Sequence, residues 1–203
     1  TSKNWDNWNT IVNSLQKTND TIKIAMVGKY VTLADSYVSV NEALKHASAS
    51  IGRSVNIDWI DSETFNGNLN QLDNFDGVLV PGGFGTRGSE GIIDTATYTL
   101  EKNIPYLGIC FGFQLAAIAF GRKMCNLENA NSTEIIADTN NPIIDLLPEQ
   151  KNETDMGGSL RLGANEIKIN QNSLAYKIYN SDKIFKRHRH RYEFNTKYRD
   201  EFL

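Results

Sequence analysis

Short apolar runs alternate along the chain with segments whose apolar residues recur every three or four positions. The runs predict strands, and the segments with helical spacing predict helices. The predicted strands are TIKIAMVG, VNIDWI, DGVLVPGG and IPYLGIC, and the predicted helices are SYVSVNEALKHASASIG, SEGIIDTATYTLEKN and FGFQLAAIAFGRKM. This alternation predicts an α/β fold with a doubly wound, mostly parallel sheet. Runs such as GVLV and YLGI are typical of strands in the middle of that sheet.

The two ends of the chain depart from this alternation. Residues 1–20 are polar and Asn-rich, and their apolar residues have helical spacing, which predicts an interdomain linker with a short helix. The domain itself is expected to span residues 21–203. After Asn126 the pattern becomes irregular. There we expect a loop from residue 140 to residue 158, then a strand-like SLRLGANEIKI and a basic segment, KRHRHRYEF.

Composition excludes several classes of protein. The formal charge of −3 and the 40% of hydrophobic residues are typical of an ordinary globular domain, without the charge excess of a nucleic-acid-binding protein. No apolar run approaches the roughly 18 residues of a membrane span. With only two cysteines and no signal peptide, we expect a cytoplasmic location and no disulfide framework. Since the chain starts at Thr1 and not at Met, we interpret it as a piece of a longer protein.

Cys110 has the most informative sequence context. It lies in GICFG, between a predicted strand and a predicted helix. The spacing G-x-C-x-G predicts a tight turn that exposes the thiol, like the G-x-S-x-G elbow of hydrolases. The N-terminus of a helix favours the thiolate, so we expect a lowered pKa for Cys110. We predict that Cys110 is a nucleophile. The alternative for Cys110 is a small buried residue at a strand end. Cys125 has no such setting, and we expect it to serve packing.

A second glycine-rich turn, PGGFG, also follows a strand. The carboxyl ends of parallel strands face one crevice, so this turn should lie opposite Cys110. We expect the N–H of Phe111 and a backbone N–H of the Gly82–Phe84 turn to stabilise an oxyanion. The wider segment also reads G-x-G-x-x-G, the dinucleotide fingerprint, but it does not follow the first strand and leaves the cysteine unused. The run KRHRHR could bind nucleic acid, but on an acidic chain an interdomain or solvated face fits better.

Several separated motifs carry a resemblance to a known family. VPGGFGTRG followed by PYLGICFGFQ resembles the class I glutamine amidotransferases. ENANSTE, DMGGSLRLG and RHRHRYEFN are similar to the glutaminase domains of the CTP synthases within that family. The resemblance implies a flavodoxin-like sheet and a cysteine that forms a glutamyl thioester and releases ammonia. A noncatalytic or regulatory module with the same fold is the alternative.

The resemblance also implies a binding site. Gly83 and Phe111 would form the oxyanion hole. Free glutamine is a zwitterion, so its pocket needs an anion for the ammonium and a cation for the carboxylate; Glu134 and Arg161 match the family's positions for these. The full set implied to bind glutamine is Gly83, Phe111, Gly112, Phe113, Gln114, Glu134 and Arg161.

The catalytic base and its orienting acid are not assigned. In the family they belong to a His-Pro-Glu motif near the C-terminus. None of the three histidines, His46, His188 and His190, is followed two residues later by Glu. We therefore expect that the chain stops at Leu203 before this motif and is inactive alone, and we interpret the RHRHRYE histidines as structural or interfacial.

The resemblance further implies the partners of the complete enzyme. The glutaminase domain would need no cofactor or metal of its own. The enzyme's synthetase domain would use the ammonia to convert UTP to CTP with ATP and Mg²⁺, GTP would activate the glutaminase allosterically, and the complete enzyme would be a homotetramer.

Overall fold

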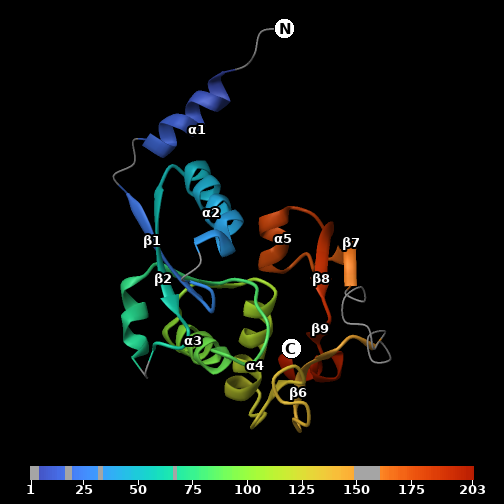
Figure 1. Ribbon diagram of the computed structural model, residues 1–203. Helices are drawn as coiled ribbons and strands as arrows, with labels where there is room; N and C mark the ends of the chain where they lie inside the picture. The colour runs from blue at the N-terminus through green and yellow to red at the C-terminus, as the bar shows by residue number, and fades with distance from the viewer. Residues whose placement is uncertain (1–4, 17–19, 32–33, 66–67, 149–160) are drawn as a thin grey trace.

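A computed structural model provides the fold (Figure 1), and it describes residues 5–16, 20–31, 34–65, 68–148 and 161–203. The helices are α1 (Asp6–Gln16), α2 (Val38–Ser50), α3 (Ser89–Lys102), α4 (Phe111–Met124) and α5 (Leu174–Tyr179). The strands are β1 (Thr21–Gly28), β2 (Ser54–Asp61), β3 (Gly77–Val80), β4 (Tyr106–Gly108), β5 (Asn131–Ser132), β6 (Pro142–Leu146), β7 (Arg161–Lys168), β8 (Lys183–His190) and β9 (Tyr192–Phe194).

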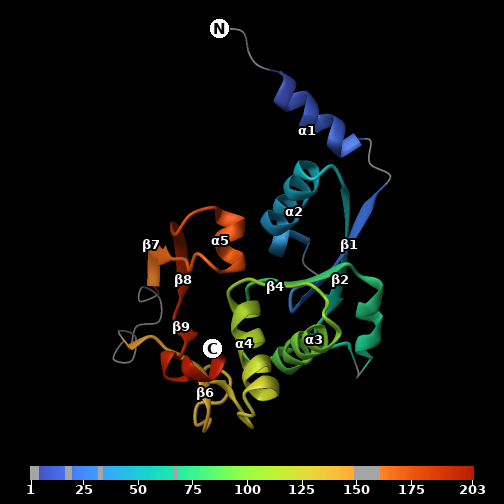
Figure 2. The ribbon, with the colours of Figure 1, turned by 180° about the vertical axis from the view of Figure 1, so that it is seen from behind.

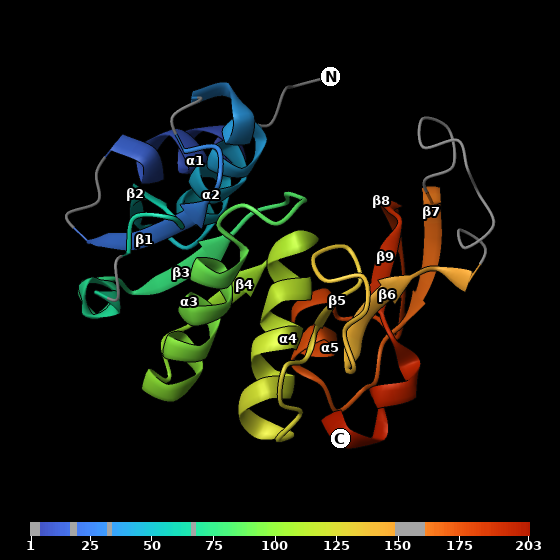
Figure 3. The same ribbon diagram turned by 60° about the horizontal axis from the view of Figure 1, so that its bottom comes forward.

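The central sheet has the strand order β2-β1-β3-β4, and all its strands are parallel. In this order β2 lies on one side of β1, and β3 and β4 follow on the other side, as in the doubly wound flavodoxin-like folds. Helix α2 lies on one face of the sheet, and α3 and α4 lie on the other (Figure 3). The predicted α/β fold with a mostly parallel sheet is confirmed.

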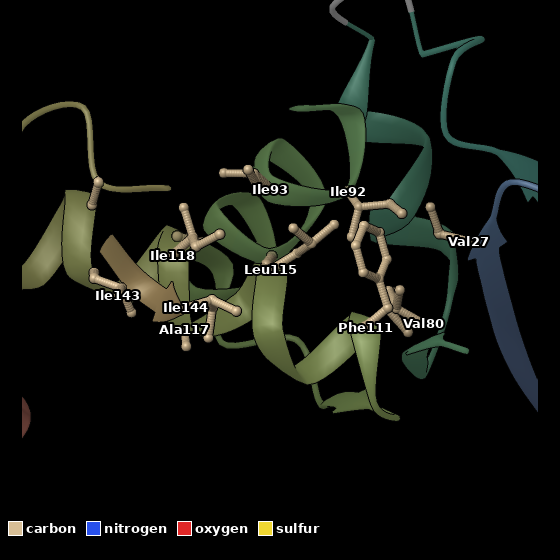
Figure 4. Close-up of a cluster of buried hydrophobic side chains, with 14 of the residues drawn as sticks. Val27, Val80, Ile92, Ile93, Phe111, Leu115, Ala117, Ile118, Ile143 and Ile144 are labelled. Carbon is tan, nitrogen blue, oxygen red and sulfur yellow. The ribbon is translucent and has the colours of Figure 1, made fainter. Parts of the chain in front are cut away.

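The two faces of the sheet bury alternate residues of the same strands. Val27 and Val80 point into the large core with α3 and α4, whereas Met26 and Leu79 pack with residues around α2. This period of two is the geometry of an extended strand buried on both sides. Figure 4 shows the large core, where the ring of Phe111 packs near Val80.

Two sequence predictions are wrong. The first concerns YLGI, which was expected in the middle of the sheet. β4 is the outermost strand of the described sheet, and Leu107 is 57% exposed. The apolar sequence YLGI therefore does not correspond to a strand that is buried on both faces of the sheet.

The second concerns the loop expected from residue 140 to residue 158. Part of it is β6, which pairs with β5 and, in antiparallel register, with β9. Ile143 and Ile144 are completely buried there. Asparagine and proline flank this strand and hide it in the local pattern, and its partner β9 lies some fifty residues further along the chain. Residues 149–160 lie outside the described part.

The strands β5, β6 and β9 lie beside α4 (Figure 3). The basic segment forms most of β8 and β9, and β8 pairs with β7 as an antiparallel hairpin. This hairpin and α5 lie on the α4 side of the molecule, away from β2 (Figure 2). Helix α1 confirms the helical spacing near the N-terminus; its role as a linker stays a prediction. None of the described helices has the length and apolar character needed to cross a membrane.

Candidate active site

Cys110 lies on a strained turn between β4 and α4. Its φ is 54° and its ψ is −105°, outside the regions that residues with a side chain normally adopt. The flanking glycines explain how the turn fits. A Cβ on Gly108 would lie 2.5 Å from the carbonyl carbon of Gly112, and a Cβ on Gly112 would lie 2.2 Å from the carbonyl oxygen of Val80. Since no side chain fits at either position, the predicted tight turn of G-x-C-x-G is confirmed, and Cys110 is exposed.

The expected lowering of the Cys110 pKa is wrong. Partial burial of the thiol raises its pKa, and this effect is the largest. The N–H of Phe111 hydrogen-bonds the sulfur and lowers the pKa, while the carboxylate of Glu134 raises it. The helix N-terminus therefore acts in the expected direction, but desolvation outweighs it.

The glycine-rich turn after β3 faces the cysteine, as expected for two turns at the same edge of the sheet. A Cβ on Gly82 would lie 3.8 Å from the Cβ of Cys110, and a Cβ on Gly83 would lie 3.4 Å from the ring of Phe111. The turn therefore approaches Cys110 through Gly82 and the next residue of α4 through Gly83. The ring of Phe111 is 2% exposed and belongs to the core, so its backbone is the part available to a substrate.

Glu134 lies beside this turn. Its Oε1 accepts a hydrogen bond from the N–H of Gly85 at 2.7 Å. Its charge also acts on Cys110, Lys29 and Tyr192, because it contributes to the pKa of each. Glu134 is thus a half-buried carboxylate close to the thiol, where the positive charge of a substrate could reach it.

On another side of Cys110 lies a cleft of about 710 Å³. Helix α4 contributes Phe113 and Gln114 to it, while Gly112 is buried against β3. The side chain of Gln114 is 8% exposed and donates a hydrogen bond to the carbonyl of Tyr192 at 2.8 Å, so it ties α4 to β9. The remaining lining comes from Ile109, Arg187, His188, Arg189, His190, Tyr192, Glu193, Phe194 and Thr196.

The histidines of the basic segment therefore line the same cleft as the cysteine. The rings of His188 and His190 lie 5.4 Å apart, and Nδ1 of His190 is 3.0 Å from the carbonyl oxygen of Tyr192. The sequence interpretation as structural or interfacial residues did not anticipate this proximity. Their spacing along β8, two residues apart, was the signal, because alternate residues of a strand share one face.

The cation expected for the substrate carboxylate has two candidate positions. The backbone of Arg161 begins β7 and pairs with His190, but its side chain lies outside the described part. Arg191 directly follows His190, and its charge lowers the pKa of Tyr192 while that of Glu134 raises it. Arg191 and Glu134 thus both influence the pKa of Tyr192. Arg191 was not among the residues predicted from the sequence. The alternating arginines of RHRHR were the available signal.

Comparison with known proteins identifies the family of the chain. The family "Glutamine amidotransferase class-I" matches residues 32–202. CTP synthase of Halalkalibacterium halodurans is 52% identical over 196 residues, which cover 96% of this chain and 37% of that protein. CTP synthase of Archaeoglobus fulgidus is 49% identical over 195 residues, 94% of this chain and 36% of that protein. The chain thus spans little more than a third of the length of these relatives.

Among solved structures, the Trypanosoma brucei CTPS glutaminase domain with bound acivicin is similar, with a TM-score of 0.81 and 33% sequence identity. The similarity covers 89% of this chain and 71% of that one. The chain belongs to the class I glutamine amidotransferase family. Within that family it is a glutaminase domain of the CTP synthase type, which confirms the resemblance seen in the sequence.

Proposed function

We propose that this domain hydrolyses L-glutamine to glutamate and ammonia through a thioester on Cys110. The observation that carries the proposal is the strained, glycine-flanked turn that exposes Cys110 opposite a second glycine turn. A cost in backbone strain is typical of a residue held in place for function.

The reaction begins when the Cys110 sulfur attacks the side-chain amide carbon of glutamine. The C=O electron pair moves to oxygen, and the N–H groups of Phe111 and Gly83 stabilise the oxyanion. As the C–N bond breaks, the thiol proton goes to the leaving nitrogen, and ammonia departs. Water then cleaves the thioester to release glutamate and restore the thiol. The base that transfers these protons stays unassigned.

Binding of glutamine requires charges for both ends of its zwitterion. Glu134 would hold the ammonium, and Arg161 the carboxylate, with Phe113 and Gln114 lining the pocket beside Gly112. Glu134 is a half-buried carboxylate near the thiol, which supports its part. Arg191 is the alternative to Arg161 as the residue that binds the carboxylate, because the charges of Arg191 and Glu134 both influence the pKa of Tyr192.

The similarity to CTP synthases extends the proposal to a larger protein. The ammonia would pass to a synthetase domain that converts UTP to CTP with ATP and Mg²⁺, with GTP as an allosteric activator and a homotetramer as the assembled form. These ligands would serve the complete enzyme, and we place ATP, UTP and Mg²⁺ in the synthetase domain.

Labelling tests the nucleophile. The full-length protein is incubated at neutral pH with an electrophilic glutamine analogue, such as a diazoketone, and the modified peptide is mapped. We expect modification of Cys110, protection by glutamine, and no modification of Cys125, whose thiol donates to the carbonyl of Glu201. Labelling of Cys125 alone, or of both thiols equally, would refute the assignment and favour a noncatalytic module.

Variants test the binding residues. Glu134→Gln and Arg161→Ala should raise the glutamine requirement of CTP formation and leave ammonia-dependent formation unchanged, because ammonia bypasses the pocket. Arg191→Ala is the matched comparison: a loss with Arg191→Ala and none with Arg161→Ala would move the carboxylate contact to Arg191. Equal losses with ammonia and glutamine would show that these residues serve the fold.

A further inference from the structure

Lys29 directly follows β1 and is buried, with 5% exposure. Its Nζ donates hydrogen bonds to the carbonyls of Phe84, at 2.9 Å, and Gly85, at 2.5 Å. The same atom lies 4.2 Å from the centre of the Phe111 ring. One ammonium therefore contacts both segments that we propose as sources of the oxyanion donors: the glycine turn and the residue that follows Cys110.

The peptide between Phe84 and Gly85 is held from both sides. Its carbonyl accepts from Lys29, and its N–H donates to Glu134 at 2.7 Å. Gly85 has a φ of +77°, so the backbone here uses a conformation that other residues rarely adopt. With carbonyl and N–H both bound, the peptide cannot rotate without breaking two charge-assisted hydrogen bonds.

The placement of Lys29 carries an energetic cost. Burial lowers its pKa to about 8, because the protein desolvates the ammonium more than the nearby carboxylates stabilise it. Its backbone is bound as well, since the Arg87 guanidinium donates to the carbonyl of Lys29 at 2.9 Å. A buried charge is weak evidence for a stabilising role, because apolar residues of similar volume usually serve stability as well or better.

We propose that Lys29 is a positioning residue for the glutaminase reaction. It holds the glycine turn against Phe111, so that the backbone donors already face Cys110 when the oxyanion forms. Donors that are fixed in advance need no reorganisation during the reaction, which is why such sites accelerate it. This inference rests on the proposed function of Cys110, and it adds a residue outside the motif regions that carried the family resemblance.

The test uses the full-length protein with Lys29→Met, which keeps the length of the side chain and removes its charge. Loss of one oxyanion donor costs about 10²–10³ in rate. Because Lys29 acts through the turn, we expect kcat for glutamine hydrolysis to fall by roughly 10–100-fold with KM changed less than about threefold. Alkylation of Cys110 by iodoacetamide forms no oxyanion, so its rate should stay within about twofold.

The matched control is Lys123→Met, which removes an exposed lysine paired with Glu101 and should leave kcat unchanged. An unchanged kcat in Lys29→Met would overturn the proposal. So would a parallel fall in kcat, alkylation rate and thermal unfolding midpoint, because that pattern belongs to a purely structural lysine.

If Lys29→Met does not fold, Lys29→Arg carries the test. The planar guanidinium cannot occupy the compact ammonium position between two carbonyls and a ring, so kcat should fall with KM retained; an unchanged kcat again overturns the proposal. Failure of the proposed function looks different, because wild type would then hydrolyse no glutamine and Cys110→Ala would change nothing.

Discussion

Gly112→Ala gives the sharpest test of how the elbow is built. The added methyl group would lie 2.2 Å from the carbonyl oxygen of Val80 and 2.8 Å from two of its side-chain carbons. An ordinary contact of this kind begins near about 3.4 Å, so α4 must move away from β3 by roughly 1 Å. Backbone atoms form the obstacle, and therefore no rotamer change can relieve it.

The loss of stability comes from contacts in the core that are weakened when α4 moves away from β3. A gap of about 1 Å forfeits up to about half of the dispersion energy of the contacts across it. Phe111 and Leu115, both buried, make such contacts from α4. Overpacking typically costs about 1–3 kcal/mol, and we expect the upper end, about 3 kcal/mol. For a domain of this size that lowers the melting temperature by roughly 6–12 °C.

Thermal unfolding of the 203-residue chain, followed by circular dichroism, measures this effect. The matched control is Gly82→Ala, where the methyl group meets only an ordinary contact of 3.8 Å with Cys110. This variant should melt within about 2 °C of wild type. A melting temperature of Gly112→Ala equal to that of Gly82→Ala would refute the steric account of the G-x-C-x-G spacing.

Three further predictions concern charge. The stability of wild type relative to Lys29→Met should rise by up to about 3 kcal/mol between pH 8 and pH 10.5, because the unfolded lysine (pKa 10.5) binds more protons there than the folded one (pKa about 8). Urea unfolding of both proteins at pH 8 and at pH 10.5 measures this change. A stability difference that is the same at both pH values would contradict the desolvation of Lys29. The rate of Cys110 alkylation by iodoacetamide should keep rising through pH 9, since burial raises the thiol pKa; a plateau below pH 8 would indicate a stabilised thiolate. Glu90→Gln removes the 2.7 Å pair with Arg122, in which the Glu90 side chain is 58% exposed, and should cost less than about 1 kcal/mol in urea unfolding. A larger loss would mean that the pair is more shielded from solvent than this exposure indicates.

The local sequence was sufficient to predict the central sheet and the elbow. Strands and helices around Cys110 follow from apolar runs and helical spacing, because both faces of a parallel sheet are buried and the pattern repeats within a few residues. The glycines around Cys110 predicted the tight turn, and the structure gives the reason for Gly108: the atoms that exclude a side chain there belong to Gly112 and Phe113, four and five residues away in α4. The order of motifs also identified the family.

Tertiary structure decided what depends on residues far apart in the chain. Strand β6 was missed because its partner β9 and its burial come from distant segments. The direction of the Cys110 pKa was wrong because desolvation depends on everything packed around the sulfur, whereas the helix N-terminus is visible locally. Lys29 could not be selected from the local sequence. Its contacts with Phe84, Gly85 and Phe111 exist only because parallel strands bring the ends of β1, β3 and β4 to one edge of the sheet.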